Sequence, residues 1–400
     1  MKFNIWNFPK KPLPDVLSFV VDNRGKTVPT AKSGHMLIAT NCVRNENLYP
    51  SYEKVRYLSE DTYQNWFRAH PVPGDILFVC KGTPGRTCMV PDPIDFCIAQ
   101  DMVALRVNPQ IIYNKYLLTV LRSKRIQKQI EQTSVGDVIP HFKKSFFDQI
   151  LIPVPPMHIQ QIIGDFYFAF SNKVELNKRI NNNLEQQARS LFKSWFVDYI
   201  PFGNTMPSNW KNGKLKDILK LKRKSIKAGI NTVLPYLPID VIPMRTFALT
   251  DFKPNAEAQS SLLTFEKDDI IIGAMRVYFH RVVLAPCDGI TRTTCFTLAP
   301  YHKEYLSFAL LCCDQDSSID YAQSTSKGST MPYAIWEGGL GDMEIAIPTL
   351  EIAQEFNEIV LPMLRQIQNS YFENNRLREI RDELLPRLMS GELDVSDIDL

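Results

Sequence analysis

The chain contains two stretches of about forty residues in which apolar side chains recur at spacings of three and four. The first extends from Ile159 to Trp195 and the second from Ile352 to Leu388. This spacing, kept up over about five heptads, predicts two long helices that each carry a narrow apolar seam. A helix of about 40 residues rises roughly 60 Å. Such a helix has no core of its own, so each of the two needs a packing partner.

The two helices are the obvious partners for each other. Because a long intervening region separates them in the chain, they can pair antiparallel, with one globular domain at each end of the rod. Asn177 and Asn374 fall on the apolar seams, where a buried polar residue can fix the register of a helix pair. The alternative is that each helix packs only on its own domain.

Short motifs recur at an offset close to half the chain, which indicates an internal duplication. Ser134-Val135-Gly136 with Pro140 matches Ser326-Lys327-Gly328 with Pro332, at an offset of 192. Further ordered matches join Gly74–Leu77 to Asp268–Ile271, Ile152–Pro153 to Ile347–Pro348, and Asn182–Leu184 to Asn375–Leu377.

Each half therefore has the same plan: a mixed region, a proline-containing strap and a long helix. Short apolar runs bounded by turn residues, such as Asp75–Val79 and Asp269–Ile272, predict buried strands in the mixed regions. The expected fold class is α+β, with two α/β domains related by a pseudo-twofold axis and separated by two long antiparallel helices. The predicted division is domain 1 at 1–155, spacer helix 1 at 156–205, domain 2 at 206–346, spacer helix 2 at 347–391 and an acidic tail at 392–400.

Charge is distributed unevenly along the chain. Residues 1–155 carry 20 Lys and Arg against 13 Asp and Glu, and residues 206–330 carry 16 against 12. Residues 331–400 carry 5 against 14. Basic blocks suit a polyanionic partner. No apolar run reaches the roughly 18 residues of a membrane helix, the N-terminus lacks a secretory apolar region, and none of the eight cysteines forms a CxxC pair. We therefore expect a cytoplasmic protein with reduced thiols.

The layout resembles the specificity subunits of type I restriction-modification systems, and the resemblance covers essentially the whole chain. The family's I-P-x-P-P…Q-Q start of the long helix is present as Ile152–Pro156 with Gln160-Gln161, and its S-x-G-x-x-x-P turn precedes both helices. The ending Leu384–Leu393 is similar to the family's second helix terminus. The second strap departs from the pattern, with Thr349-Leu350 and Gln354-Glu355 in place of the proline and glutamine pairs.

This resemblance implies a non-catalytic DNA-recognition subunit that binds an asymmetric, two-part site on double-stranded DNA. It also implies assembly with two methyltransferase subunits and with restriction subunits, which would bind S-adenosylmethionine, ATP and Mg²⁺; no cofactor or metal is expected in this chain. The helices are the expected docking surface, through Phe192, Trp195 and Phe196 on the first and acidic residues on the second.

Loops that combine Lys or Arg with Gly, Ser or Thr are the candidate DNA contacts, since such side chains bind phosphates and guanine edges. The candidates are Arg24, Lys26, Thr27, Lys81, Arg86, Ser134, His141, Lys143, Lys144, Lys222, Arg223, Arg276, His280, Arg281, Ser326, Lys327, Ser329 and Tyr333. An ordinary solvated surface is the alternative interpretation for any single one of them.

Two other function classes have weaker support. Gly25-Lys26-Thr27 resembles the end of a phosphate-binding loop, but Val20 occupies the position of the required glycine. The six histidines show no paired metal-ligand spacing, so a stand-alone nuclease or methyltransferase is disfavoured. A coiled-coil scaffold that binds protein only would explain the helices but not the basic domains.

Overall fold

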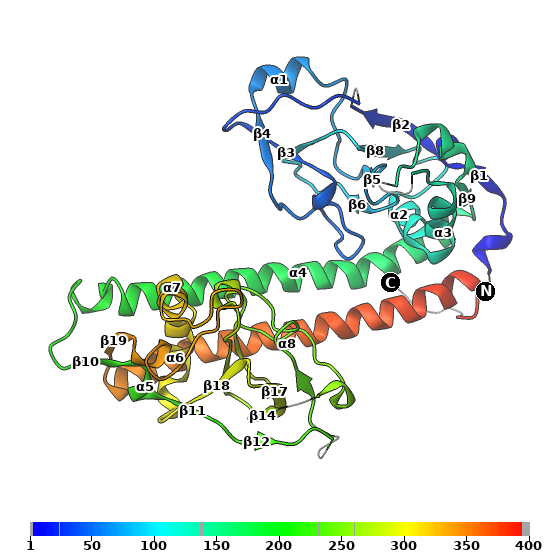
Figure 1. Cartoon of the computed structure of the whole chain (residues 1–400). Helices are drawn as coiled ribbons and strands as arrows, with labels where there is room; N and C mark the ends of the chain where they lie inside the picture. The colour runs from blue at the N-terminus through cyan, green and yellow to red at the C-terminus, as the bar shows by residue number, and fades with distance from the viewer. Residues whose placement is uncertain (1–2, 24, 137–139, 230–232, 260, 394–400) are drawn as a thin grey trace. The chain divides into compact units, whose positions relative to one another are not determined.

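The computed structural model describes residues 3–23, 25–136, 140–229, 233–259 and 261–393. The chain forms two units (Figure 1), and each contains parts of both long helices. Unit 1 comprises Met1–Glu175 and Arg376–Leu400, and unit 2 comprises Leu176–Asn375. The helices are α4 (Met157–Phe196) and α8 (Leu350–Ser390). The predicted ranges of domains and spacers stay a prediction.

Unit 1 is built on a four-stranded antiparallel sheet in the order β2-β8-β5-β6. Its central strand β5 is fully buried, as the apolar run after Asp75 predicted. A second sheet, β4-β3-β7, combines an antiparallel with a parallel pair. The elements of this unit before α4 are β1 (Lys10–Pro12), β2 (Leu17–Asp22), β3 (His35–Ile38), β4 (Arg56–Leu58), α1 (Glu60–Asn65), β5 (Ile76–Val79), β6 (Thr87–Met89), β7 (Phe96–Ile98), β8 (Met102–Val107), α2 (Asn114–Arg122), α3 (Lys124–Thr133) and β9 (Leu151–Pro153).

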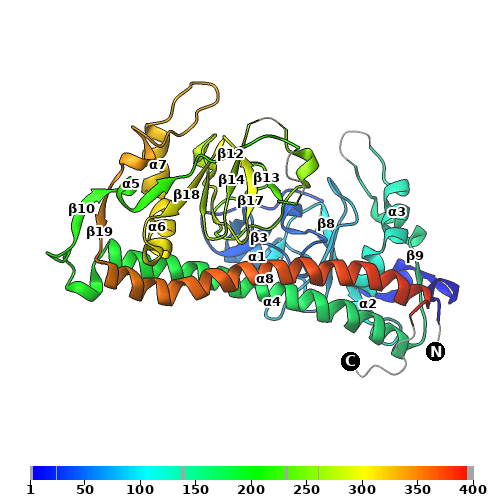
Figure 2. The same ribbon diagram turned by 90° about the horizontal axis from the view of Figure 1, so that it is seen from below.

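Unit 2 repeats the same plan. Its main sheet has the order β11-β18-β15-β16, and a second sheet has the order β12-β14-β17-β13. Figure 2 shows α6 beside the long helices. Phe308 of α6 packs on Phe196 of α4, with 4.7 Å between ring centroids, in a core that also contains Phe356 of α8. The elements of this unit between the long helices are β10 (Lys211–Lys214), α5 (Leu215–Ile218), β11 (Leu219–Leu221), β12 (Ser225–Ile226), β13 (Tyr236–Leu237), β14 (Leu262–Phe265), β15 (Ile270–Gly273), β16 (Val282–Leu284), β17 (Gly289–Arg292), β18 (Cys295–Pro300), α6 (Leu306–Cys313), α7 (Asp316–Ser324) and β19 (Glu344–Ile347).

The straps are equivalent down to single hydrogen bonds, which confirms the duplication. In unit 1 strand β9 pairs antiparallel with β1, and in unit 2 β19 pairs antiparallel with β10. The buried hydroxyl of Tyr116 donates to the carbonyl of Pro153 at 2.9 Å, and that of Tyr305 donates to Pro348 at 2.8 Å. Each tyrosine thus fixes the residue at which the chain turns from the strap toward the long helix.

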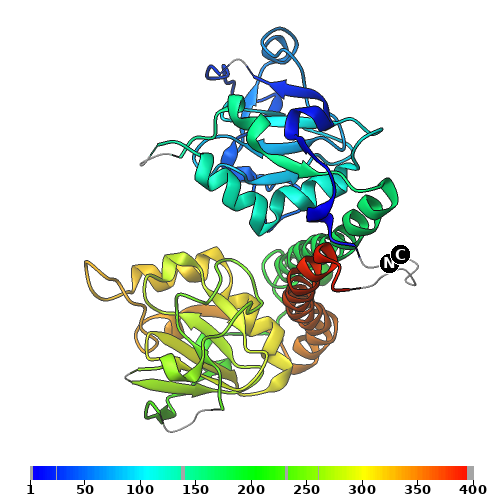
Figure 3. The same ribbon diagram turned by 90° about the vertical axis from the view of Figure 1, so that its right-hand side faces the viewer.

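The two long helices pack together within each unit (Figures 1 and 3). In unit 1 the start of α4 shares a core with the end of α8, where Ile163 and Leu388 are buried. In unit 2 the end of α4 shares a core with the start of α8, where Phe196 lies 4.8 Å from Phe356 between ring centroids. The pairing is therefore antiparallel in both units, as predicted. The placement of the domains along the helices stays a prediction.

The predicted polar pair on the seam is confirmed. The amide nitrogen of Asn177 donates to the side-chain oxygen of Asn374 at 2.9 Å and to Glu373 at 2.7 Å. Both asparagines are almost fully buried. Ile180 and Ile359 also follow the spacing of three and four that defined the predicted seams, but both are exposed, so the prediction was wrong at these two positions. In α8 the buried row contains Val360 and Leu364 instead, because a helical turn of 3.6 residues lets either of two neighbouring positions face the partner.

Candidate nucleic-acid interface

The S-x-G-x-x-x-P turn of unit 1 forms the base of a finger that leans on the loop after β5. Val135 and His141 pair through two backbone hydrogen bonds of 2.9 and 2.8 Å. His141 also forms a bridge with Lys81, and the amide of Gly82 donates to the carbonyl of Pro140 at 2.9 Å. This pairing brings three predicted segments together, those that contain Lys81, Ser134 and His141. We call residues 134–136 and 140–143 finger 1.

Unit 2 contains the same construction, and we call residues 326–335 finger 2. Lys327 and Tyr333 exchange two backbone hydrogen bonds of 2.9 Å, and Tyr333 forms a bridge with Met275. The amide of Arg276 donates to the carbonyl of Pro332 at 2.8 Å. The predicted residues Arg276, Lys327 and Tyr333 therefore meet at one place.

Exposed cations and polar groups surround both fingers. In unit 1 Lys81 and Lys143 are exposed and His141 is half-buried. In unit 2 the finger borders a groove of about 530 Å³ lined by Arg223, Lys327 and Tyr333, with Phe296 and Trp336 also in its wall. The exposed Ser329 lies between the paired residues of finger 2. A cationic rim on a solvent-facing loop can bind phosphates, and the polar side chains can meet base edges.

Two predicted lysines are instead paired with carboxylates of the same unit. Lys144 forms an ion pair with Asp22. Lys222 bonds both carboxylate oxygens of Asp269 at 2.9 Å. Burial alone would lower the pKa of Lys222, but its hydrogen bonds to Asp269 and Glu266 raise the pKa above its ordinary value. The carboxylate beside each ammonium group offsets its charge and so weakens its attraction for phosphate.

The side chains of two further predicted residues of unit 2 contact other groups of the same unit. Arg281 donates to the backbone carbonyl of Ile239. His280 is only 3% exposed, and its Nε2 lies 2.9 Å from the buried carboxylate of Asp314. His280 was predicted as a DNA contact, but its side chain is buried because the chain turns it inward toward an acidic partner.

The predicted residues Ser134 and Ser326 bond to the helices that precede them. The hydroxyls of Ser134 and Ser326 each donate to a helix carbonyl, Ile130 and Ala322, at 2.7 Å. They end α3 and α7 in the same way and thereby set the direction in which each finger leaves its helix.

The other predicted residues of unit 1 do not belong to finger 1. Lys26 and Thr27 are exposed in the loop after β2, Arg86 is half-buried at the end of the loop after β5, and Arg24 lies outside the described residues.

The sequence reasoning also erred on the helices and missed one feature of unit 2. Phe192 and Phe196 are 3% and 6% exposed, so they belong to the core and cannot form a docking face. The exposed rings of Tyr278 and Phe279 were not predicted, although they stand between the predicted Arg276 and His280. An aromatic pair flanked by basic residues was the available indication.

Among the described residues, no group of three or more His, Cys, Asp or Glu side chains is placed to hold a metal ion. Within the same part of the chain, every helix is too short or too polar to cross a bilayer.

Comparison with known proteins places this geometry in context. Residues 26–186 match the family model of the type I restriction modification DNA specificity domain. The type I restriction enzyme MjaIX specificity subunit of Methanocaldococcus jannaschii is 26% identical over 72% of this chain and 71% of that protein. The HindI specificity subunit of Haemophilus influenzae is 23% identical over 80% of this chain and 86% of that protein. The crystal structure of a type I restriction-modification S subunit from M. genitalium, 16% identical, covers 96% of both chains with a TM-score of 0.62 and so shares the fold.

Proposed function

Because the chain belongs to the family of type I restriction-modification specificity subunits, we propose that it is the DNA-recognition subunit of such a complex and that each unit binds one half of a two-part site. The observation that carries this proposal is the pair of fingers. Each is formed by the same backbone hydrogen bonds, and each presents exposed basic and polar side chains.

The two half-sites differ, so the target is asymmetric. At three equivalent positions the units carry Lys81, Val135 and His141 in one and Met275, Lys327 and Tyr333 in the other. Base edges in the major groove present different patterns of donors and acceptors. A change from imidazole to phenol and from valine to lysine therefore changes which bases fit. The shared backbone keeps the mode of docking while the side chains set the sequence.

The long helices support a second role, which is to separate the domains and to dock partner subunits. On unit 2 they expose the apolar side chains of Leu176, Ile180, Ile359 and Phe372. Because Phe192 and Phe196 are buried, these four take their place in the proposed docking surface. The exposed acidic residues of α8 suit basic partner surfaces; they are Glu351, Glu355, Glu358, Glu379 and Glu383.

Catalysis is assigned to the partners. Two methyltransferase subunits would bind S-adenosylmethionine, and restriction subunits would bind ATP and Mg²⁺. The chain itself would be non-catalytic and act in the cytoplasm, where the chromosome lies. The acidic tail proposed for residues 392–400 falls mostly outside the described residues, which end at Leu393.

A mobility-shift titration tests the proposal. The full chain is mixed with the methyltransferase subunits of the same system and with a duplex that carries the site methylated in the host. We expect binding that weakens steeply with salt and that exceeds binding to a scrambled duplex by about 10³-fold or more. Binding that ignores both salt and sequence would refute DNA recognition and favour a scaffold that binds protein only.

A further inference from the structure

The loop after β5 in unit 1 and the loop after β15 in unit 2 each begin and end with a residue of positive φ, but the unit 2 loop is one residue longer and the residue types differ. In unit 1 these positions are Gly82 (φ 88°) and Gly85 (φ 86°). In unit 2 they are Arg276 (φ 50°) and His280 (φ 53°). The positions correspond because Gly82 and Arg276 donate to the equivalent carbonyls of Pro140 and Pro332. Gly85 and His280 directly precede the arginines that pair back to the preceding strand.

Left-handed backbone suits glycine and costs conformational energy for other residues. Unit 1 meets the requirement with glycine at both positions. Unit 2 keeps arginine and histidine there, and such strain persists only where surrounding contacts enforce it. The side chains of this loop therefore have a use that glycine could not supply.

Between the two strained residues, a single 3-10 turn, η7 (Val277–Phe279), holds Val277 in the core and turns two aromatic rings outward. Tyr278 is 44% exposed and Phe279 is 36% exposed. Their ring centroids lie 4.9 Å apart, and the guanidinium of Arg281 lies 5.5 Å from the Phe279 centroid. We call Tyr278 and Phe279 the aromatic tip.

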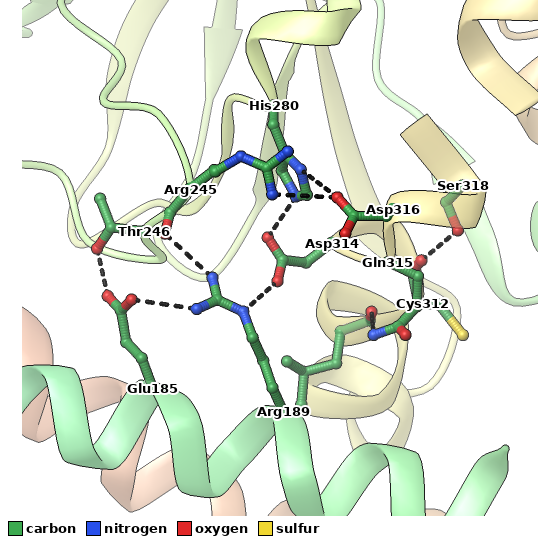
Figure 4. A network of polar contacts seen from close by, with 11 residues as sticks. Glu185, Arg189, Arg245, Thr246, His280, Cys312, Asp314, Gln315, Asp316 and Ser318 are labelled. Atoms are coloured by element: carbon green, nitrogen blue, oxygen red, sulfur yellow. Dashed lines mark hydrogen bonds and ion pairs between the residues drawn. The ribbon is translucent and has the colours of Figure 1, made fainter. Parts of the chain in front are cut away.

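A buried polar network fixes this turn to the long helix α4 (Figure 4). His280 Nε2 lies 2.9 Å from Asp314, and the other carboxylate oxygen of Asp314 accepts from Arg189 Nε of α4 at 2.8 Å. The Asp314 side chain is 1% exposed. Burial alone would lower the pKa of Arg189, but its bonds to Asp314 raise the pKa above its ordinary value, so the guanidinium stays charged.

Further contacts close the network around the turn. His280 Nδ1 lies 3.3 Å from Asp316, which also pairs with Arg245 at 3.1 Å. The amide of Arg245 donates to the backbone carbonyl of His280 at 2.8 Å. The carbonyl of Arg245 accepts from Arg189 at 3.1 Å, and Arg189 also pairs with Glu185 of α4. The tip is therefore held at its base by both the side chain and the backbone of His280.

We propose that the aromatic tip is a rigid wedge that enters a base step of the half-site bound by unit 2. The proposal rests on the proposed function, since the partner is the same DNA. The bond from Arg276 to Pro332 places the turn beside finger 2, and the exposed Arg276 supplies positive charge next to the rings. Proteins that kink DNA insert apolar side chains between base pairs, and the wedge must resist the cost of unstacking. The anchor to α4 supplies that resistance.

The test uses the full chain with its methyltransferase subunits and a duplex that carries 2-aminopurine at successive positions of the half-site bound by unit 2. With the unaltered chain we expect a rise in 2-aminopurine fluorescence at one step, because unstacking removes quenching by the neighbouring bases. The double variant Tyr278→Ala with Phe279→Ala should lose that rise and bind about 10- to 100-fold more weakly, the loss expected for one stacked base.

Two controls keep the outcome interpretable. Tyr301→Ala removes a more exposed aromatic ring of the same unit, 57% exposed after β18, and should change neither signal. Tyr278→Phe keeps the ring and should retain the fluorescence rise.

The possible failures are distinguishable. If the unaltered complex binds its site specifically but the double variant binds within twofold with the same fluorescence, the wedge is refuted and recognition stands. If the unaltered complex shows no sequence preference, the proposed function fails and the wedge fails with it.

Discussion

The buried asparagine pair between α4 and α8 predicts an unequal pair of mutational effects. Asn177 has two acceptors, Asn374 and Glu373, at 2.9 and 2.7 Å. The side-chain nitrogen of Asn374 is buried and has no partner among the described residues. Asn177→Leu therefore leaves Asn374 with no bond to α4, whereas Asn374→Leu leaves Asn177 still bonded to Glu373.

The magnitudes follow from the cost of unsatisfied buried groups, about 1–3 kcal/mol each. We expect Asn177→Leu to destabilise the helix pair by about 2–3 kcal/mol and Asn374→Leu by about 1 kcal/mol or less. The double leucine variant removes both amides and buries two apolar side chains, so it should be at least as stable as the unaltered chain.

Hydrogen exchange by mass spectrometry over residues 170–184 and 364–378 provides the assay, because it reports local opening in a chain too large for a single unfolding transition. About 2 kcal/mol corresponds to roughly 30-fold faster exchange. Equal effects of the two single variants, with simple addition in the double variant, would show that the pair does not bond as described.

Three further predictions concern unit 2, the thiols and finger 1. Asp314→Ala should destabilise unit 2 by about 2–4 kcal/mol, and Asp314→Asn by less, because the alanine leaves His280 and Arg189 without their shared partner; equal urea midpoints for the two variants would contradict the network. Burial raises the pKa of the Cys80 and Cys97 thiols to about 12, so the thiolate is scarce at pH 8. Since the half-buried Cys287 is the most accessible of the eight thiols, native chain should react there first with a thiol-specific disulfide reagent; fast labelling of a second cysteine before unfolding would count against the described burial. Lys81→Ala with Lys143→Ala should lower the slope of log K against log salt by about 1–2, whereas Lys220→Ala, a matched exposed lysine on β11, should leave it unchanged; a slope unaffected by the double variant would remove finger 1 from the phosphate contacts.

The periodicity of the sequence was enough to predict the long helices and their antiparallel pairing, because a seam of that length has few partners in one chain. Strands β5 and β15 were also predicted, since both are apolar runs bounded by turn residues. The asparagine pair followed from its position on the seams. These features depend on local spacing, which a sequence displays directly.

Local spacing could not predict whether an individual Lys or Arg side chain is paired with a carboxylate of the protein. Lys144 meets Asp22 across 122 positions, and Lys222 meets Asp269 across 47. Only the tertiary fold brings these groups together. The aromatic tip was missed for a similar reason, because nothing in the sequence shows that Arg276 and His280 adopt left-handed backbone. Phe192 and Phe196 were assigned to the wrong face because α6, which covers them, comes more than 100 residues later.

Sequencing the methylated bases of a host that carries the whole system tests the central claim most directly. One strain carries Lys81→Ala with His141→Ala, and a second carries Lys327→Ala with Tyr333→Ala. We predict that each pair relaxes the base preference in one half of the methylated motif, a different half in each strain, and leaves the other half and the spacing unchanged. Relaxation of both halves by one pair, or of the same half by both pairs, would contradict the assignment of one half-site to each unit.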